Sequence, residues 1–213
     1  MKNSLVTTIT AVAISLLFSL PAWAISIDFQ PSSQNVNLGD SFAVDLVISG
    51  LGDHAADSLS TFDIDILFDS AILGVDETDS DSDGVIDSVV LDPSSQLDIG
   101  GWGLNSVSAG LTDIGVLNIY DLSFDSVDNL HDFQAPNFTL ATITFDAIGL
   151  GTSTLSVNAS SLILGDAYGA PLSADVSSGS VTSAPVPEPA TFLLMGLGLA
   201  GLLGLRKKLP EVR

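Results

Sequence analysis

The sequence predicts an all-β protein: a jelly-roll β-sandwich between an N-terminal signal peptide and a single C-terminal transmembrane helix. Three observations support this fold class. Apolar and polar residues alternate over short segments, clusters of glycine and aspartate separate these segments, and the middle of the chain has no long helical period. Many short strands at this spacing are typical of two packed sheets, since each sheet must bury one face against the other.

The first 24 residues have the parts of a secretory signal peptide. Lys2 precedes an apolar run over Val12–Leu20, and the small residues Ala22 and Ala24 form a cleavage pattern. We expect cleavage after Ala24. An uncleaved anchor helix is the alternative, but the apolar run is short and is followed by Pro21.

Residues 25–183 are the expected domain, and about 160 residues are enough for one sizeable core. Its clearest strands are Ser41–Ser49 and Phe62–Phe68, where every second residue is apolar. This alternation gives one core-facing side and one wet side, as in an antiparallel sheet of a sandwich. Further strands are predicted at Ile27–Phe29, Ala71–Val75, Ser88–Leu91, Ile114–Leu122, Thr139–Ala147, Thr154–Val157, Leu162–Leu164 and Asp175–Val181.

The charge of this domain is strongly negative. All five basic residues of the chain lie in the terminal segments, whereas only Glu188 and Glu211 of the 26 acidic residues do, which leaves 24 acids in the domain. Nucleic-acid binding is excluded, because it depends on cations that meet phosphates. Repulsion between the acids must be relieved by screening, protonation or bound cations, so a divalent cation is one expected partner. An acidic surface that only keeps an exported protein soluble is the alternative.

The absence of cysteine excludes disulfides and thiolate metal sites. The stability of the exported domain must therefore come from its core, with calcium as a possible addition.

The tail has three parts. Pro187, Glu188 and Pro189 precede an apolar segment at 190–205, and Arg206, Lys207 and Lys208 follow it. As a helix, the apolar segment is ~24 Å long, a little less than the ~30 Å of bilayer hydrocarbon. It has no polar face, which favours a membrane span over a buried core helix. The basic residues then stay on the cytoplasmic side, with everything upstream outside.

Together these features resemble the PEP-CTERM sorting signal of Gram-negative bacteria, which we place at residues 184–213. The resemblance implies recognition by an exosortase-type membrane enzyme and removal of the tail near Pro187, Glu188 and Pro189. These residues are then a substrate for that enzyme. Export through the inner membrane would deliver the protein to the cell envelope, the cell surface or an extracellular polysaccharide matrix. Its membrane anchoring is transient if the tail is cleaved and permanent if it is not.

The domain resembles a second family. Leu38–Leu46, Phe62–Asp69, Leu140–Ala147 and Gly151–Leu155 are similar to the corresponding segments of cohesin domains. Cohesins of cellulosome proteins are nine-stranded jelly-roll sandwiches that bind dockerin modules, and the wider fold group includes carbohydrate-binding modules. The resemblance implies the fold. Dockerin-binding residues are not transferred, because the long acidic middle of this chain, Asp76–Asp132, departs from the family.

An Asp-rich loop at about 76–92 contains the sharpest local motif, in which Asp79, Asp81, Asp83 and Asp87 alternate with other residues around Gly84. Carboxylates two residues apart, followed by a glycine at the sharp turn, are typical of calcium loops. The first nine positions resemble the loops of dockerins, EF-hands and thrombospondin type 3 repeats. The twelfth is Val90 instead of a bidentate acid, so Asp92 or Asp76 would have to substitute. A solvated acidic loop is the alternative.

Other candidate sites are weaker. Trp102 lies on a glycine-rich loop, where an aromatic ring can stack on a sugar, although packing in the core or at an edge is the commoner role. His54 and His131 lie in predicted loops without a second ligand at a suitable spacing. We therefore expect no zinc or nucleophilic site.

These observations predict an exported, non-enzymatic binding or structural module that contacts polysaccharide or another surface protein. The first alternative is a carbohydrate-binding module for polysaccharide binding or degradation, with Trp102 or Tyr120 as an exposed platform. The second is a secreted glycoside hydrolase, which needs two facing carboxylates in a cleft. The sequence singles out no such pair.

Overall fold

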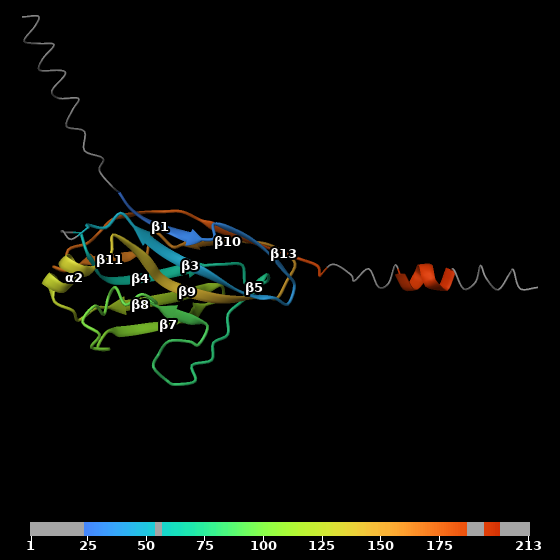
Figure 1. The fold of residues 1–213 in the computed structure, drawn as a ribbon, viewed down its shortest axis with the longest axis horizontal. Helices are drawn as coiled ribbons and strands as arrows, with labels where there is room; N and C mark the ends of the chain where they lie inside the picture. Colours follow the sequence, from blue (N-terminus) through green and yellow to red (C-terminus); the bar gives the residue numbers. More distant parts are fainter. Residues whose placement is uncertain (1–23, 54–56, 187–193, 201–213) are drawn as a thin grey trace, which may run out of the picture.

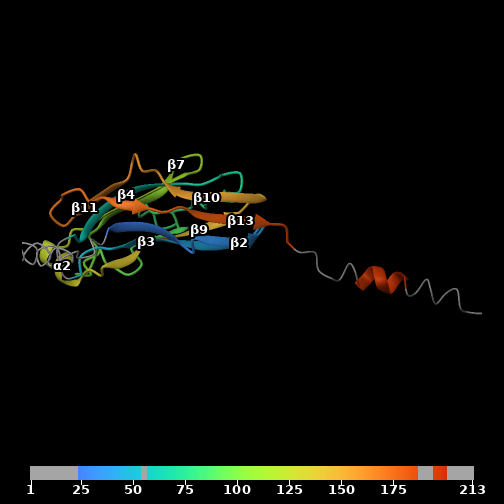
Figure 2. The same ribbon diagram turned by 90° about the horizontal axis from the view of Figure 1, so that it is seen from above.

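The computed structural model describes residues 24–53, 57–186 and 194–200, and residues 24–186 form a two-layer β-sandwich (Figures 1 and 2). One short helix, α2, lies at one end of the sandwich (Figure 1). The elements in chain order are β1 (Ile25–Gln30), β2 (Ser33–Asn37), β3 (Ser41–Ser49), β4 (Leu59–Leu67), β5 (Leu73–Gly74), β6 (Val89–Leu91), β7 (Ser106–Asp113), β8 (Val116–Leu122), α2 (Val127–Phe133), β9 (Asn137–Ala147), β10 (Gly151–Val157), β11 (Ile163–Asp166), β12 (Ala174–Val176) and β13 (Gly179–Ala184).

Two sheets form the layers. The six-stranded sheet has the order β12-β1-β3-β9-β5, with β6 also paired to β9. The seven-stranded sheet has the order β2-β13-β10-β4-β8-β7, with β11 also paired to β4. The predicted all-β sandwich is confirmed. The pairing is antiparallel except for β1 with β12 and β2 with β13. These two pairs are parallel because both strands of each pair start at the same end of the sandwich.

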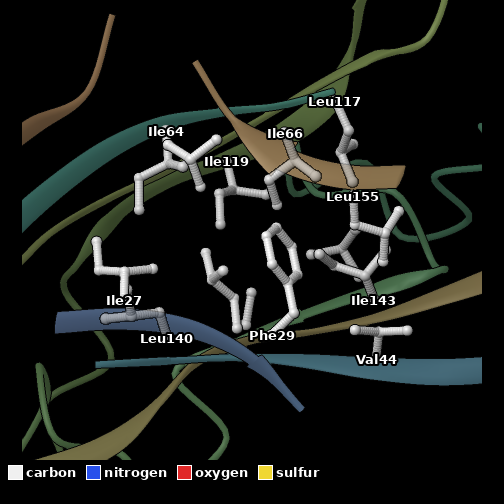
Figure 3. Close-up of a cluster of buried hydrophobic side chains, with 14 of the residues drawn as sticks. Ile27, Phe29, Val44, Ile64, Ile66, Leu117, Ile119, Leu140, Ile143 and Leu155 are labelled. Atoms are coloured by element: carbon white, nitrogen blue, oxygen red, sulfur yellow. The ribbon is translucent and has the colours of Figure 1, made fainter. Parts of the chain in front are cut away.

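The core lies between the sheets, and the alternating pattern of the strands builds it. In β4, Phe62, Ile64 and Ile66 face inward, while the intervening aspartates face outward. Figure 3 shows side chains from both layers meeting in this space, among them Ile119 from β8 and Phe29 from β1. Burying each such side chain contributes about 1.5–3 kcal/mol, so these contacts hold the sheets together.

An aromatic group fills one part of this core. The Phe145 ring stacks on Phe42 with a centroid distance of 6.0 Å and meets Phe68 edge-on at 5.4 Å. These geometries are favoured by the ring quadrupole and add to the burial of apolar area.

Some elements differ from the sequence prediction. The predicted strand Asp175–Val181 is two strands, β12 and β13, and of the predicted strand Ala71–Val75 only the two residues of β5 are strand, with a turn before them. Three elements were not predicted, namely β2, β7 and α2. Each has only one buried residue, so none gives a clear period of 2 or 3.6.

The terminal predictions fall mostly outside the described residues. The signal peptide, residues 1–24, is described only at Ala24, and of the predicted span at 190–205 only residues 194–200 are described, as helix. Within the described ranges, no helix has both the length and the apolar character needed to cross a membrane.

Candidate functional site

The acidic loop, Asp76–Ser88, brings three of its four predicted calcium ligands together. Carboxylate oxygens of Asp79, Asp81 and Asp83 all lie within 4.8 Å of one another. A calcium ion takes six to eight oxygen ligands, so one ion among these side chains can contact all three. Asp81 and Asp83 are exposed and Asp79 is half-buried, which leaves the remaining ligand positions open to water.

Backbone N–H groups hold the loop in this shape. Asp79 accepts hydrogen bonds from the N–H groups of Ser82, at 2.8 Å, and Gly84, at 3.1 Å. Asp83 accepts one from Val85, at 2.8 Å. Gly84 has a φ of 91°, a left-handed conformation that residues with a Cβ rarely adopt. The glycine therefore makes the sharp turn that the motif requires.

The acidic loop also joins the two sheets. The backbone N–H of Ala109, in the edge strand β7, donates to the Gly84 carbonyl at 3.0 Å, and the Ile86 N–H donates to the Ala109 carbonyl at 3.2 Å. Directly after the loop, β6 pairs with β9 of the other sheet. The loop thus leaves the six-stranded sheet after β5, contacts the edge strand β7 of the seven-stranded sheet, and returns to the six-stranded sheet at β6.

The fourth predicted ligand, Asp87, lies in a different group. Its carboxylate accepts hydrogen bonds from the Ser80 backbone N–H at 3.1 Å and the Ser80 hydroxyl at 2.7 Å. Together with Asp76 and Asp146 it lines a surface cavity of about 320 Å³. Hydrogen bonds from the Thr78 hydroxyl and then its backbone N–H lower the pKa of Asp76. The hydrogen bonds between Asp87 and Ser80 therefore join two parts of the acidic loop, next to Asp79, Asp81 and Asp83.

A second acidic group, which we call the buried acid cluster, consists of Asp92, Asp98 and Asp121. With Asn105, these residues line a cavity of about 270 Å³. Asp121 is only 1% exposed and Asp92 only 8%, whereas Asp98 is half-buried. No motif in the sequence marks this cluster as a site.

The position of Asp121 in β8 is unusual. Leu117 and Ile119 point into the core, and Asp121 is the next residue on the same face, opposite Phe62 of β4. A signal for it was available in the sequence. The alternation within the predicted strand Ile114–Leu122 places this one carboxylate where an apolar side chain is expected.

The loop between β6 and β7 folds over Asp121 and is tied down by the other two acids. Asp92 accepts hydrogen bonds from the backbone N–H groups of Gln96, at 2.8 Å, and Leu97, at 2.6 Å. Asp98 likewise accepts two bonds from backbone N–H groups of the glycine-rich loop, at 2.8 and 2.9 Å. Both oxygens of each carboxylate are thus engaged.

Asp121 has fewer partners than its neighbours. Its Oδ1 accepts a hydrogen bond from Asn105 Nδ2 at 3.0 Å, and among the described residues no donor reaches its Oδ2. Burial, and then the charge of Asp92, raise the pKa of Asp121 to about 7, although the Asn105 bond acts in the opposite direction. Burial also raises the pKa of Asp92. The described ranges contain no Lys or Arg that could neutralise these charges.

Trp102 stands out from its loop. It is 71% exposed, and the flanking Gly101 and Gly103 have φ values of 64° and 61°, which glycine adopts without strain. Tyr120, the other predicted platform residue, is half-buried in the outer face of β8. Tyr168 is 72% exposed, and sequence reasoning did not single it out.

The two histidines have no described metal ligand set. His131 lies on α2, where a loop was predicted, and its ring meets Tyr168 edge-on at 5.2 Å. Its buried Nε2 has no hydrogen-bond partner among the described residues. His54 lies outside the described residues.

The outer face of β4 and β8 carries an ordered polar surface, which we call the polar sheet face; it consists of Asp63, Asp65, Asn118 and Tyr120. Asn118 Nδ2 donates to Oδ1 of Asp63 at 2.7 Å and to Oδ1 of Asp65 at 3.0 Å. The Ser161 hydroxyl donates to the other oxygen of Asp65 at 2.6 Å. These bonds fix side chains that would otherwise be mobile on a flat surface.

Comparison with family models finds one match, to the PEP-CTERM protein-sorting motif at residues 185–208. The matched range contains the predicted sorting residues, Pro187, Glu188, Pro189 and Arg206–Lys208, all of which lie outside the described residues. No curated protein matches the chain.

Solved structures with a similar fold include several cohesins. The sixth cohesin of Acetivibrio cellulolyticus scaffoldin B, solved with the Cel5 dockerin, is 18% identical with a TM-score of 0.53, and the alignment covers 76% of this chain and 99% of that one. The cohesin CaCohA2 from Clostridium acetobutylicum is 18% identical with a TM-score of 0.54, and 76% and 91% of the two chains are covered.

A non-cellulosomal cohesin from the archaeon Archaeoglobus fulgidus is 10% identical with a TM-score of 0.53, covering 80% of this chain and 97% of that one. At these identities the likeness is one of fold. The chain therefore joins a domain with the cohesin fold to a C-terminal PEP-CTERM sorting motif.

Proposed function

We propose that this chain is an exported, non-enzymatic module that binds a protein partner at the cell surface or in the extracellular matrix. The observation that carries this proposal is the combination of a PEP-CTERM sorting motif with a cohesin fold. Neighbouring structures include a cohesin in complex with a dockerin.

The sorting step can be tested separately from binding. We expect replacement of Pro187, Glu188 and Pro189 by alanine to stop tail processing and to lower the surface-exposed fraction of the protein in the cells that export it. The measurement is protease accessibility on intact cells. A matched triple alanine variant at Leu209, Pro210 and Glu211 keeps the motif and serves as the control. Equal surface delivery of both variants would contradict the role of the motif.

The polar sheet face is the binding surface that we favour. It lies on two adjacent inner strands of the seven-stranded sheet, β4 and β8, and Asn118 holds its two aspartates in fixed positions. Side chains held in place before binding lose less conformational entropy in a complex. Tyr120, in the same face, is of a residue type that is enriched at protein interfaces.

Charge indicates the chemistry of the partner. The described residues of this domain contain no Lys or Arg, and the polar sheet face offers carboxylate oxygens as acceptors. A partner must therefore bring the cationic side chains, and we infer a protein with Lys or Arg in its binding surface. Such complementarity accelerates association and weakens with added salt.

A position-specific crosslinking experiment tests this surface. A photo-crosslinking amino acid is placed at Tyr120, or at Val47 on the outer face of the other sheet as a control, in the full chain exported by its own cells. We expect a discrete adduct from position 120 alone. The adduct should disappear in an Asp63→Asn/Asp65→Asn variant and weaken at high salt. Adducts of equal yield from both faces would overturn the proposed surface.

We also propose that calcium stiffens the acidic loop through Asp79, Asp81 and Asp83. Its support is the approach of their oxygens to within 4.8 Å. The test is a thermal melt of the full chain in calcium and in chelator, at fixed ionic strength. Calcium that binds only the native state stabilises it by ~2.7 kcal/mol when the free calcium concentration is 100 times the dissociation constant. Asp81→Asn/Asp83→Asn should abolish the gain, and the exposed control Asp175→Asn should retain it; a gain retained by both contradicts the site.

One observation favours a second function, binding of a neutral polysaccharide. Trp102 is 71% exposed beside the half-buried Asp98, so an aromatic platform lies next to a hydrogen-bond acceptor. Affinity electrophoresis in gels that contain neutral polysaccharides tests it. Retardation of the full chain that is lost in Trp102→Ala and kept in Tyr168→Ala supports a platform at Trp102. Equal mobility of all three proteins in every gel excludes this function.

A further inference from the structure

One end of the sandwich carries exposed apolar side chains, which we call the apolar tip; it consists of Leu38, Ile148, Leu150 and Val186. Their exposed fractions are 38%, 58%, 55% and 59%. Backbone hydrogen bonds of 2.8 Å join the turn after β2 to the ends of β13 and β9, through the carbonyls of Ala184 and Ala147. These bonds bring the segments of the tip together, and exposed apolar patches generally mark contact surfaces.

The turn that carries Ile148 and Leu150 is held rigidly. The backbone N–H groups of Ile148 and Gly149 both donate to the Ile72 carbonyl, at 2.9 and 3.1 Å. Gly149 packs so closely that a Cβ built on it would overlap the Ala71 carbonyl oxygen. The turn therefore cannot fold inward to bury its two large apolar side chains, so their exposure is built into this end of the domain.

The apolar tip is also free of charge, although the domain as a whole is strongly acidic. The three chain segments that meet there, residues 29–39, 147–165 and 176–187, contain no charged residue. The acids that border two of them are engaged: Asp40 accepts two hydrogen bonds from Asn37, both at 2.9 Å, and Asp146 accepts one from the Ser41 hydroxyl. A surface without charges loses little hydration energy when it leaves water.

The chain leaves the sandwich at this end, opposite α2 (Figures 1 and 2). Only residues 185–189 separate the last residue of β13, Ala184, from the predicted membrane segment at 190–205. Fully extended, this linker spans at most about 20 Å. The predicted segment is ~24 Å long as a helix, shorter than the ~30 Å of hydrocarbon, so insertion draws part of the linker toward the bilayer. Little chain is then left to separate the apolar tip from the lipid headgroups.

We propose that the apolar tip contacts the membrane surface while the tail is uncleaved, with Leu38, Ile148 and Leu150 at the boundary between headgroups and acyl chains. This inference rests on the proposed sorting function, in which residues 190–205 insert before processing. Apolar side chains bind this boundary in proportion to the area that they bury. The lipid surface is zwitterionic, because anionic headgroups would repel the acidic domain.

Contact at the apolar tip orients the whole domain. The end with α2 then points away from the membrane (Figure 1). The loop of Trp102 lies at that far end, since its Gly100 N–H donates to Asp125, just before α2, at 3.0 Å. Processing of the tail removes the tether, so this orientation belongs to the unprocessed protein.

The test uses fluorescent labels on single cysteines, because the chain contains no cysteine of its own. Full chains with Ile148→Cys, Tyr168→Cys or Leu199→Cys are labelled and reconstituted in phosphatidylcholine vesicles that carry nitroxide quenchers on the headgroup or along the acyl chain. Residue 168 contacts His131 of α2, so it is the exposed control at the far end. Residue 199 lies in the tail and reports whether the tail inserts.

We expect headgroup nitroxides to remove most of the emission of the label at residue 148 and almost none at residue 168, while acyl-chain nitroxides quench residue 199. Adding Leu38→Ser/Leu150→Ser should weaken the quenching at residue 148, whereas the exposed control Ile163→Ser should leave it unchanged.

Two kinds of failure can be told apart. If residue 199 is quenched, but residues 148 and 168 are quenched equally or the double serine variant keeps full quenching at residue 148, the tail inserts and the contact of the apolar tip is wrong. If residue 199 is not quenched, the tail does not enter lipid, and the proposed contact falls together with the membrane step of sorting.

Discussion

The acidic loop and the buried acid cluster are built from the same residue type, but their surroundings differ. In the acidic loop, Asp81 and Asp83 are exposed, so water solvates their charges. In the buried acid cluster, Asp121 and Asp92 are covered, and burial raises their pKa values. The comparison shows that the number of aspartates says little about their chemistry. What matters is how much water each carboxylate keeps.

The largest expected effect concerns the pH dependence of Asp121. In the unfolded chain its pKa is near the ordinary value of 3.8, whereas in the folded protein it is about 7. Between these values the native state retains a proton that the unfolded state has lost. The stabilisation is therefore complete below the unfolded pKa and is lost as the pH rises through about 7. Its size is on the order of 4 kcal/mol, since each pKa unit is about 1.4 kcal/mol.

Denaturant unfolding of the full chain in chelator, at a series of pH values, measures this effect. The Asp121→Asn variant cannot ionise, so its stability should fall less between pH 4 and 8, and the difference between the proteins should widen with pH. The exposed control Asp175→Asn should follow the wild-type curve. Parallel curves for wild type and Asp121→Asn would mean that Asp121 is ionised at neutral pH in the folded protein, against the burial argument.

The second prediction compares two aspartates that each accept two backbone N–H bonds. Asp92→Ala removes the acceptors of Gln96 and of Leu97, which is fully buried, so water cannot easily replace them. We expect the free energy of unfolding to fall by about 2 kcal/mol. Hydrogen bonds to charged groups contribute ~1.5–3 kcal/mol, and relief of the repulsion between Asp92 and its acidic neighbours offsets part of the loss. Asp79→Ala removes two similar bonds in the open acidic loop and should cost less than about 1 kcal/mol in chelator.

Chemical denaturation in chelator at one pH measures both variants. Equal losses in the free energy of unfolding for the two variants would contradict the prediction, because the burial of the N–H groups that lose their acceptor would then make no difference to stability. A larger cost for Asp79→Ala would reverse the comparison.

The same reasoning explains what the sequence could and could not predict. The strands Ser41–Ser49 and Phe62–Phe68 follow from strict alternation, and the structure confirms both. The edge strand β7 has one buried residue, Ala109, and α2 has one, Leu130, so their burial patterns are too weak to detect. These elements form because tertiary contacts select them, not because of local periodicity.

The two acidic groups differ in the same way. The acidic loop is local in sequence, so Asp79, Asp81 and Asp83 could be predicted as neighbours, although the pairing of Asp87 with Ser80 could not. The buried acid cluster joins segments that lie far apart in the chain, and only the fold brings Asp92 to Asp121. The inward position of Asp121 in β8 was readable from alternation, but its neighbours were not.

The smallest prediction concerns the shape of the acidic loop. Gly84 has a φ of 91°, and a Cβ built there would meet only the Val107 carbonyl oxygen, at 3.8 Å. The cost of Gly84→Ala is therefore one of backbone conformation and not of space, and we expect about 1–2 kcal/mol. Gly110, in the adjacent strand β7, has open space and no positive φ, so Gly110→Ala should change stability by less than about 0.5 kcal/mol. Thermal melts in chelator measure both variants.

Because Gly84 also positions the N–H that binds Asp79, Gly84→Ala should weaken the calcium-dependent rise in melting temperature, whereas Gly110→Ala should preserve it. A full calcium response in Gly84→Ala would show that the turn is not needed to assemble the three carboxylates, and the acidic loop would then resemble the buried acid cluster in having carboxylates fixed by the fold around them.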